Sequence, residues 1–168
     1  MIEALSFVFA GLFIASALTD ILYLRIPNVI VAALLVAFVV ACFAASPKSI
    51  LLAHVAPALV VFVLTAGLFF FDKLGGGDVK LLTAAVLWTG MAHMGPFLIG
   101  LGIYGMIAIL IFAVYRTHVA AVLTWAGAHI GRSIPTPKSL ETGKSIPYGV
   151  VIAAAALSVG PGILGGFQ

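Results

Sequence analysis

Two aspartates stand at the ends of apolar segments. Asp78 follows Gly75-Gly76-Gly77 and precedes an apolar run that opens with Val79-Lys80. Asp20 ends an earlier apolar run and is followed by Ile26-Pro27-Asn28. A carboxylate close to hydrocarbon is costly and usually functional. The pair therefore suggests an aspartyl dyad, in which an ionised carboxylate takes a proton from water while a protonated one polarises a carbonyl.

The glycines before the second aspartate admit two explanations. Glycine lets a backbone turn sharply or lets another chain approach closely. In the simpler explanation, the glycines form a turn and Asp78 is the N-cap of the next helix. In the functional one, Gly75 and Gly77 leave room for a substrate strand to come within hydrogen-bonding reach of the two carboxylates.

Hydrophobic residues make up 64% of the 168 residues and charged residues only 8%, against about 25% in a soluble domain. The charges are segregated and leave stretches of about 18 or more residues without any, which is typical of membrane spans. The formal charge of +3 therefore reports topology and is no sign of nucleic-acid binding. The sole cysteine, Cys42, lies in an apolar run, which excludes an internal disulfide and a multi-cysteine metal site.

Six apolar runs predict an all-α, polytopic membrane protein with six transmembrane helices. The runs cover residues 2–19, 29–45, 50–71, 79–94, 97–115 and 146–164. The fourth rises only about 24 Å, against a hydrocarbon core of about 30 Å, so its aspartate end is expected just below the membrane surface. Gly95-Pro96 is expected to turn the chain, and Pro57 to kink the third helix or mark its start. With no internal repeat or linker, residues 1–168 are expected to form one domain.

Residues 116–145 are the one long polar-leaning segment. Within it, residues 119–130 are apolar but too short to span, which predicts an interfacial or re-entrant helix. His118 and His129 flank this piece, but two histidines without a nearby carboxylate make a poor metal site, so neither metal nor cofactor is expected. Trp88, in the fourth run, is either an interfacial anchor or a packing residue.

Basic residues predict the orientation. Of the loops between the six runs, the odd-numbered ones hold or adjoin seven of the eight lysines and arginines, and Lys48 alone lies in an even one. The positive-inside rule then puts the odd loops in the cytoplasm and both termini outside. Asp20 and Asp78 share the cytoplasmic side in this arrangement.

Gly75-Gly76-Gly77-Asp78 resembles the motif of the GxGD family of intramembrane aspartyl proteases. Three further features narrow the resemblance to bacterial type IV prepilin peptidases. They are Asp20 with Ile26-Pro27-Asn28, the continuation Val79-Lys80-Leu81, and Pro147-Tyr148-Gly149 at the start of the last run. The likeness extends over most of the chain, at matching spacings in a matching six-helix layout.

The resemblance implies that Asp20 and Asp78 are the catalytic pair. It implies supporting or substrate-approach roles for a few neighbours: Gly75, Gly77, Lys80, Pro27 and Asn28. The implied reaction is removal of the short basic leader of prepilins or pseudopilins, after a glycine, on the cytoplasmic side of the bacterial inner membrane. The implied partners are that leader with the pilin's N-terminal helix, and the lipid bilayer.

The chain differs from the larger members of the resembled family. It lacks their N-terminal cytoplasmic domain with its four cysteines, so no N-methyltransferase activity is expected. Its size is similar to that of the compact peptidases of tight-adherence (Flp-type) pilus systems.

Two other classes of function remain as alternatives. One is a small proton-coupled transporter or channel subunit, because membrane aspartates also act as proton relays. A relay favours carboxylates near the middle of spans, whereas both aspartates here lie at span ends. The other is a structural subunit of pilus assembly, which requires no positioned pair of carboxylates.

Overall fold

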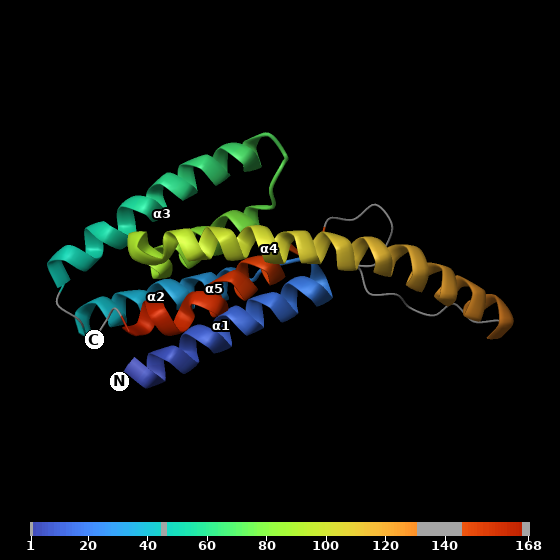
Figure 1. The fold of residues 1–168 in the computed structure, drawn as a ribbon, viewed down its shortest axis with the longest axis horizontal. Coiled ribbons are helices and arrows are strands. Elements are labelled where there is room, and N and C mark those ends of the chain that lie inside the picture. The colour runs from blue at the N-terminus through green and yellow to red at the C-terminus, as the bar shows by residue number, and fades with distance from the viewer. Residues whose placement is uncertain (1, 45–46, 131–145, 166–168) are drawn as a thin grey trace.

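Five helices account for nearly all of the described chain. The computed structural model describes residues 2–44, 47–130 and 146–165. The helices are α1 (Ile2–Tyr23), α2 (Asn28–Ala44), α3 (Pro47–Phe70), α4 (Gly76–Ile130) and α5 (Tyr148–Gly165). They pack lengthwise, with the start of α1 and the far end of α5 at the same end of the bundle (Figure 1). The expected all-α class is confirmed for the described residues.

Helix α1 is longer than its apolar run. It continues through Asp20 to Tyr23, so the prediction that it ends with the apolar run at Asp20 is wrong. The hydroxyl group of Thr19 is satisfied within the helix, because its Oγ1 donates to Ala15 O at 3.1 Å. The helix stops at Leu24, which has a positive φ of 51° and donates its N–H to Asp20 O at 2.9 Å, a left-handed C-terminal cap.

Helix α3 begins at Pro47, which suits the first turn because that position needs no N–H donor. Pro57 lies inside the helix, so the alternative that it marks the start of the helix is wrong. At the other end, Asp72 has a φ of 55° and Lys73 donates its N–H to Leu68 O at 2.9 Å. This is a Schellman-type end.

Helix α4 folds back on itself at Gly90. Gly90 has φ 61° and ψ −176° and interrupts the helix, whereas Pro96 lies within helix. The predicted turn at Gly95-Pro96 is therefore wrong; a reversal with positive φ suits glycine, and proline's ring holds φ near −65°. The reversal brings Leu101 to the same pocket as Asp78, although a straight helix would separate them by roughly 35 Å.

The second leg of α4 continues without interruption to Ile130 and projects beyond the other helices (Figure 1). The separate interfacial helix expected over residues 119–130 is therefore wrong, because these residues prolong a helix already formed. Residues 131–145, which carry three of the basic residues used to predict orientation, lie outside the described residues.

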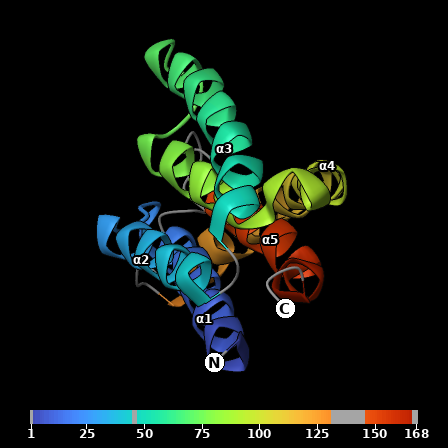
Figure 2. The ribbon, with the colours of Figure 1, turned by 90° about the vertical axis from the view of Figure 1, so that its left-hand side faces the viewer.

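The core contains an aromatic cluster at the level of the first leg of α4. Trp88 is fully buried, its ring centroid lies 5.2 Å from that of Phe9 and 5.7 Å from that of Phe38, and its Nε1–H donates to Leu34 O at 3.0 Å. Trp88 is thus a packing residue that joins α1, α2 and α4. Helix α3 packs mainly against α4 and leans away from α1 and α2 (Figure 2).

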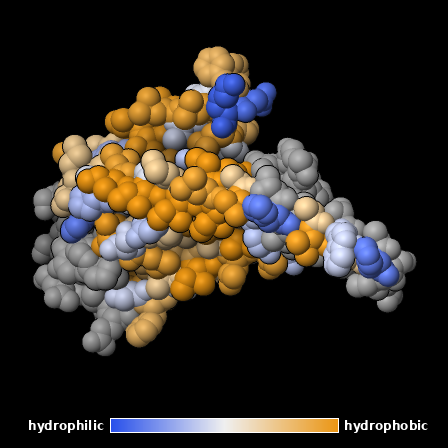
Figure 3. Space-filling view, turned by 45° about the vertical axis from the view of Figure 1, so that its right-hand side comes forward, coloured by the Kyte–Doolittle hydropathy of each residue, from blue (hydrophilic) through white to orange (hydrophobic). Residues whose placement is uncertain are grey.

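The outer surface of the bundle is strongly apolar, and hydrophobic atoms cover most of its visible flank (Figure 3). Within the part of the chain that the structure describes, three stretches are long and apolar enough to cross a membrane: Ala4–Tyr23, Leu52–Phe70 and Gly76–Tyr115. Helices α2 and α5 contribute shorter apolar segments. The chain is therefore a multi-pass membrane protein; six spans and external termini remain predictions.

Candidate active site

Asp20 lies in the last turn of α1 and is almost completely buried, with 5% of its surface exposed. Its Oδ2 accepts a hydrogen bond of 2.7 Å from the Gly149 N–H, in the first turn of α5. A buried carboxylate requires such a donor. The partner is supplied by a helix 129 residues away in the sequence.

Asp78 is the third residue of α4, which begins at Gly76. The explanation of Asp78 as the N-cap is therefore wrong, because Gly75 is the residue that precedes the helix. The Asp78 carboxylate instead folds back toward Gly75 and forms a hydrogen bond with the Gly75 backbone. An acidic side chain at the third position often bonds the capping residue in this way. Asp78 is partly buried and close enough to Asp20 for the two charges to interact.

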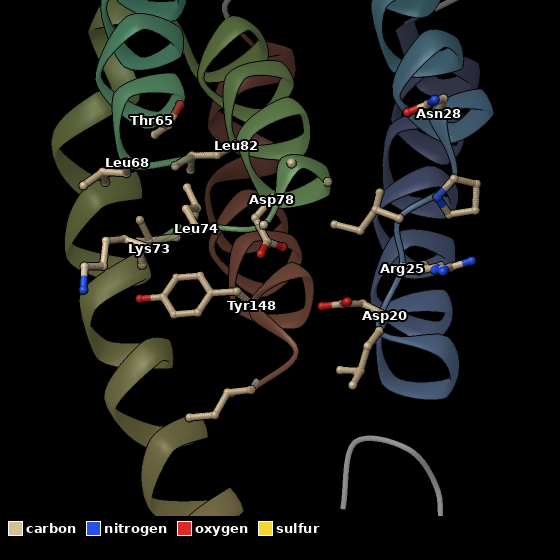
Figure 4. A pocket seen from close by; sticks show the side chains of 18 residues that line it. Asp20, Arg25, Asn28, Thr65, Leu68, Lys73, Leu74, Asp78, Leu82 and Tyr148 are labelled. Atoms are coloured by element: carbon tan, nitrogen blue, oxygen red, sulfur yellow. The ribbon is translucent and has the colours of Figure 1, made fainter. Parts of the chain in front are cut away.

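Both carboxylates line one open pocket of about 970 Å³ at the end of the bundle away from the start of α1. Their side chains point into the same space, Asp20 from α1 and Asp78 from α4 (Figure 4). The lining comes from all five helices and from both short connections at this end: Asp20, Leu24, Arg25, Ile26, Pro27, Asn28, Thr65, Leu68, Lys73, Leu74, Gly75, Gly76, Gly77, Asp78, Leu82, Leu101, Ile146 and Tyr148. The two acids therefore share the pocket with both apolar and polar side chains.

Gly77 is in close contact with the segment that follows Asp20, and Gly75 is in close contact with Asp78 of its own segment. A Cβ on Gly77 would lie 3.3 Å from Cβ of Ile26, and a Cβ on Gly75 would lie 3.0 Å from Oδ2 of Asp78. Neither glycine has a positive φ. A methyl group at either position would crowd these neighbours; the predicted role of the two glycines in admitting a substrate strand stays a prediction.

The other predicted supporting residues also meet here. Lys80 Nζ donates to Asn28 Oδ1 at 3.1 Å on the exposed rim, which ties the start of α4 to the start of α2. Pro27 lines the pocket, and its carbonyl accepts from the Ile30 N–H at 3.1 Å in the first turn of α2. All seven predicted site residues therefore lie in or beside one pocket.

Several pocket residues were not assigned to the site from the sequence. Tyr148, Ile26 and Lys73 line the pocket, and Gly149 holds Asp20. The Pro147-Tyr148-Gly149 motif was a usable signal for α5, but it gave no indication that Asp20 is its partner. Asp72 is exposed and is not among the lining residues.

Metal binding finds no support in the described ranges. No group of three or more histidine, cysteine, aspartate or glutamate side chains that could hold a metal ion occurs among residues 2–44, 47–130 and 146–165. The expectation of a reaction without metal or cofactor remains a prediction.

A comparison with known protein families identifies the class to which this fold and site belong. A profile of the type IV leader peptidase family matches residues 7–125, most of the chain, including both aspartates. The chain therefore belongs to the type IV leader peptidase family, and the predicted resemblance is confirmed at that level. No curated protein matched significantly, and no solved structure did. Helix α5 lies outside the matched residues.

Proposed function

We propose that this protein is a membrane-embedded aspartyl endopeptidase that removes the short basic leader of type IV prepilins or pseudopilins. The observation that supports it best is the presence of Asp20 and Asp78 in one pocket of a member of a leader peptidase family. Hydrolysis of a peptide bond needs a base that takes a proton from the attacking water and an acid that protonates the carbonyl oxygen. Two carboxylates facing a shared space can supply both.

The proposed reaction uses the dyad in its singly protonated form. Two neighbouring carboxylates resist carrying two charges, so the pair holds one proton, which belongs to both. The ionised member takes a proton from water as the water oxygen attacks the carbonyl carbon, and the other gives its proton to the carbonyl oxygen. The tetrahedral intermediate then collapses: the C–N bond breaks, the leaving nitrogen gains a proton, and the new carboxyl terminus is released.

The pocket suits an extended segment that ends in a hydrophobic helix. Apolar side chains such as Leu68, Leu82 and Leu101 line it beside the two acids, and it opens at one end of an apolar bundle. A pilin precursor whose N-terminal helix lies in the bilayer would present its leader at that level. Arg25 and Lys73 also line the pocket; by the positive-inside rule they favour a cytoplasmic face of the bacterial inner membrane.

The experiment is cleavage of a synthetic prepilin-like peptide by the full chain in detergent, followed by mass spectrometry of the products. Asp20→Asn and Asp78→Asn should each lower kcat by about 10³-fold or more, because each removes an acid or base that acts as part of a unit. Asp72→Asn, an exposed acid outside the pocket lining, is the matched control. If either dyad variant is well folded and cleaves at a substantial fraction of the wild-type rate, the proposed dyad is wrong.

A transport function predicts a different result. A proton-coupled transporter would leave the peptide intact and would dissipate a pH gradient across sealed vesicles that contain the protein. Cleavage that requires both aspartates, with no proton flux, supports the peptidase.

A further inference from the structure

Helix α5 makes a contact with the dyad that the family match does not cover. The match ends at residue 125, whereas α5 begins at Tyr148. The Gly149 N–H nevertheless donates to Asp20 Oδ2 at 2.7 Å in a buried setting. We propose that Gly149 is a positioning residue, which sets the orientation of the Asp20 carboxylate toward the pocket and toward Asp78. This inference rests on the proposed peptidase function.

The space around Gly149 has no room for a side chain. A Cβ at this position would lie 2.8 Å from Oδ2 of Asp20, 3.1 Å from Cβ of Asp20 and 3.0 Å from Cδ1 of Ile26. Two of these three atoms belong to the aspartate itself. Any larger residue must therefore push α5 away from α1 or turn the carboxylate out of its place.

The position and direction of the hydrogen bond from Gly149 are suited to a carboxylate acceptor. Gly149 is in the first turn of α5, where backbone N–H groups have no partner within the helix and the helix dipole favours a negative charge. Pro147, immediately before the helix, is buried and Ile146 lines the pocket. The start of α5 is thus anchored at the site, and a donor fixed in this way can hold a carboxylate in one orientation.

The proposed positioning of Asp20 by Gly149 predicts a particular kinetic defect in a Gly149 variant. A displacement of about 1 Å in a catalytic group can cost about 100-fold in rate. Gly149→Ala should accordingly lower kcat by roughly 100-fold and leave KM within about twofold of the wild type, because Asp20 acts on the reacting bond and the remaining pocket wall still binds substrate. The pH profile of kcat should also change position, since the carboxylate loses a fixed donor.

Two glycines provide matched controls. A Cβ on Gly160, eleven residues beyond Gly149 in α5, would lie 3.1 Å from Cε1 of Phe9 in α1 and has neither aspartate within 4 Å among its nearest atoms. A Cβ on Gly102 in α4 would have no neighbour within 4 Å. Gly160→Ala therefore tests crowding between the same two helices, and Gly102→Ala tests the substitution alone. Both variants should keep kcat within about threefold of the wild type.

A second variant tests whether the effect of Gly149→Ala arises from its contact with Asp20 or from its contact with Ile26. Ile26→Val removes Cδ1, the one atom outside Asp20 that a Cβ at 149 would meet within 3.1 Å. Combined with Gly149→Ala, it should fail to restore kcat if the defect lies in Asp20. Recovery of kcat to the level of the Ile26→Val single variant would show that Gly149 only makes room for Ile26, and would overturn the inference.

The outcomes distinguish this inference from the proposed function. If the wild type cleaves and Asp20→Asn does not, the peptidase stands whatever Gly149→Ala does. Wild-type kcat in a folded Gly149→Ala protein would then overturn the positioning role alone. A loss of kcat accompanied by the same loss in Gly160→Ala would also overturn it, because helix crowding would be sufficient.

Discussion

The reversal of α4 should depend on Gly90 more strongly than on any other glycine of that helix. Gly90 combines φ 61° with ψ −176°, a region that is essentially restricted to glycine and costs other residues about 1–3 kcal/mol. A Cβ there would also lie 2.7–2.9 Å from Cε1, Nδ1 and Nε2 of His54. Gly90→Ala must therefore strain the backbone and displace the imidazole.

The displaced imidazole has a structural role of its own. His54 Nδ1–H donates to Leu87 O at 2.8 Å, a carbonyl in the last turn before the interruption, where helical acceptors lack their usual partners. Loss of that bond costs about 0.5–1.5 kcal/mol. Together with the backbone strain, Gly90→Ala should lower the free energy of unfolding by roughly 2–4 kcal/mol.

The assay is equilibrium unfolding of the purified protein in mixed micelles, monitored by circular dichroism. The control is Gly95→Ala, an exposed helical position whose Cβ would meet nothing within 4 Å; it should be neutral or slightly stabilising, because alanine favours a helix by about 1 kcal/mol over glycine. In the double variant Gly90→Ala/His54→Ala the clash disappears while the backbone strain remains, so its cost should be smaller than the sum of the singles. A Gly90→Ala protein as stable as the wild type, or fully additive costs, would refute the reasoning.

Three further outcomes follow from the described residues. Asp72→Asn should keep the wild-type kcat and at most raise KM, more at low salt, because Asp72 is exposed at the end of α3; a complete loss of kcat would mean that the catalytic pair is misassigned. Trp88→Ala should lower the free energy of unfolding by about 3–5 kcal/mol, whereas Trp125→Ala, 66% exposed, should change it by less than about 0.5 kcal/mol; equal effects in the unfolding assay would contradict the core described above. In a cysteine-free background, a cysteine at position 47 should react with an impermeant thiol reagent outside intact cells and cysteines at 132–144 should not; the reverse pattern would place both aspartates on the outer face.

The convergence of the two aspartates was predictable from the sequence because it depends on parity. Asp20 stands at the end of the first apolar run and Asp78 at the start of the fourth, so they adjoin the first and third connections. Helices that alternate in direction place these two connections at the same end of the bundle. The close approach of the segments was also predictable in kind, since glycines at 75 and 77 indicate it. Which atoms they approach, Ile26 and the carboxylate of Asp78 itself, depends on tertiary packing.

Two other features of the fold could not be predicted from the sequence, and the reason is physical. Gly95-Pro96 is the stronger local turn signal, yet the reversal lies at Gly90, where His54 from another helix completes the turn. Helix α1 continues past Asp20, and the Asp20 carboxylate meets its hydrogen-bond donor on α5. In both cases the deciding partner is remote in sequence, and a reading of local pattern has no access to it.

The donor that holds Asp20 comes from the last helix described along the chain. Synthesis proceeds from the N-terminus, so both aspartates are synthesised before Gly149. Until α5 inserts, the buried Asp20 lacks its backbone donor and the pocket lacks the wall formed by Tyr148. A nascent or stalled chain would therefore be proteolytically silent, and activity would begin with the completion of membrane insertion.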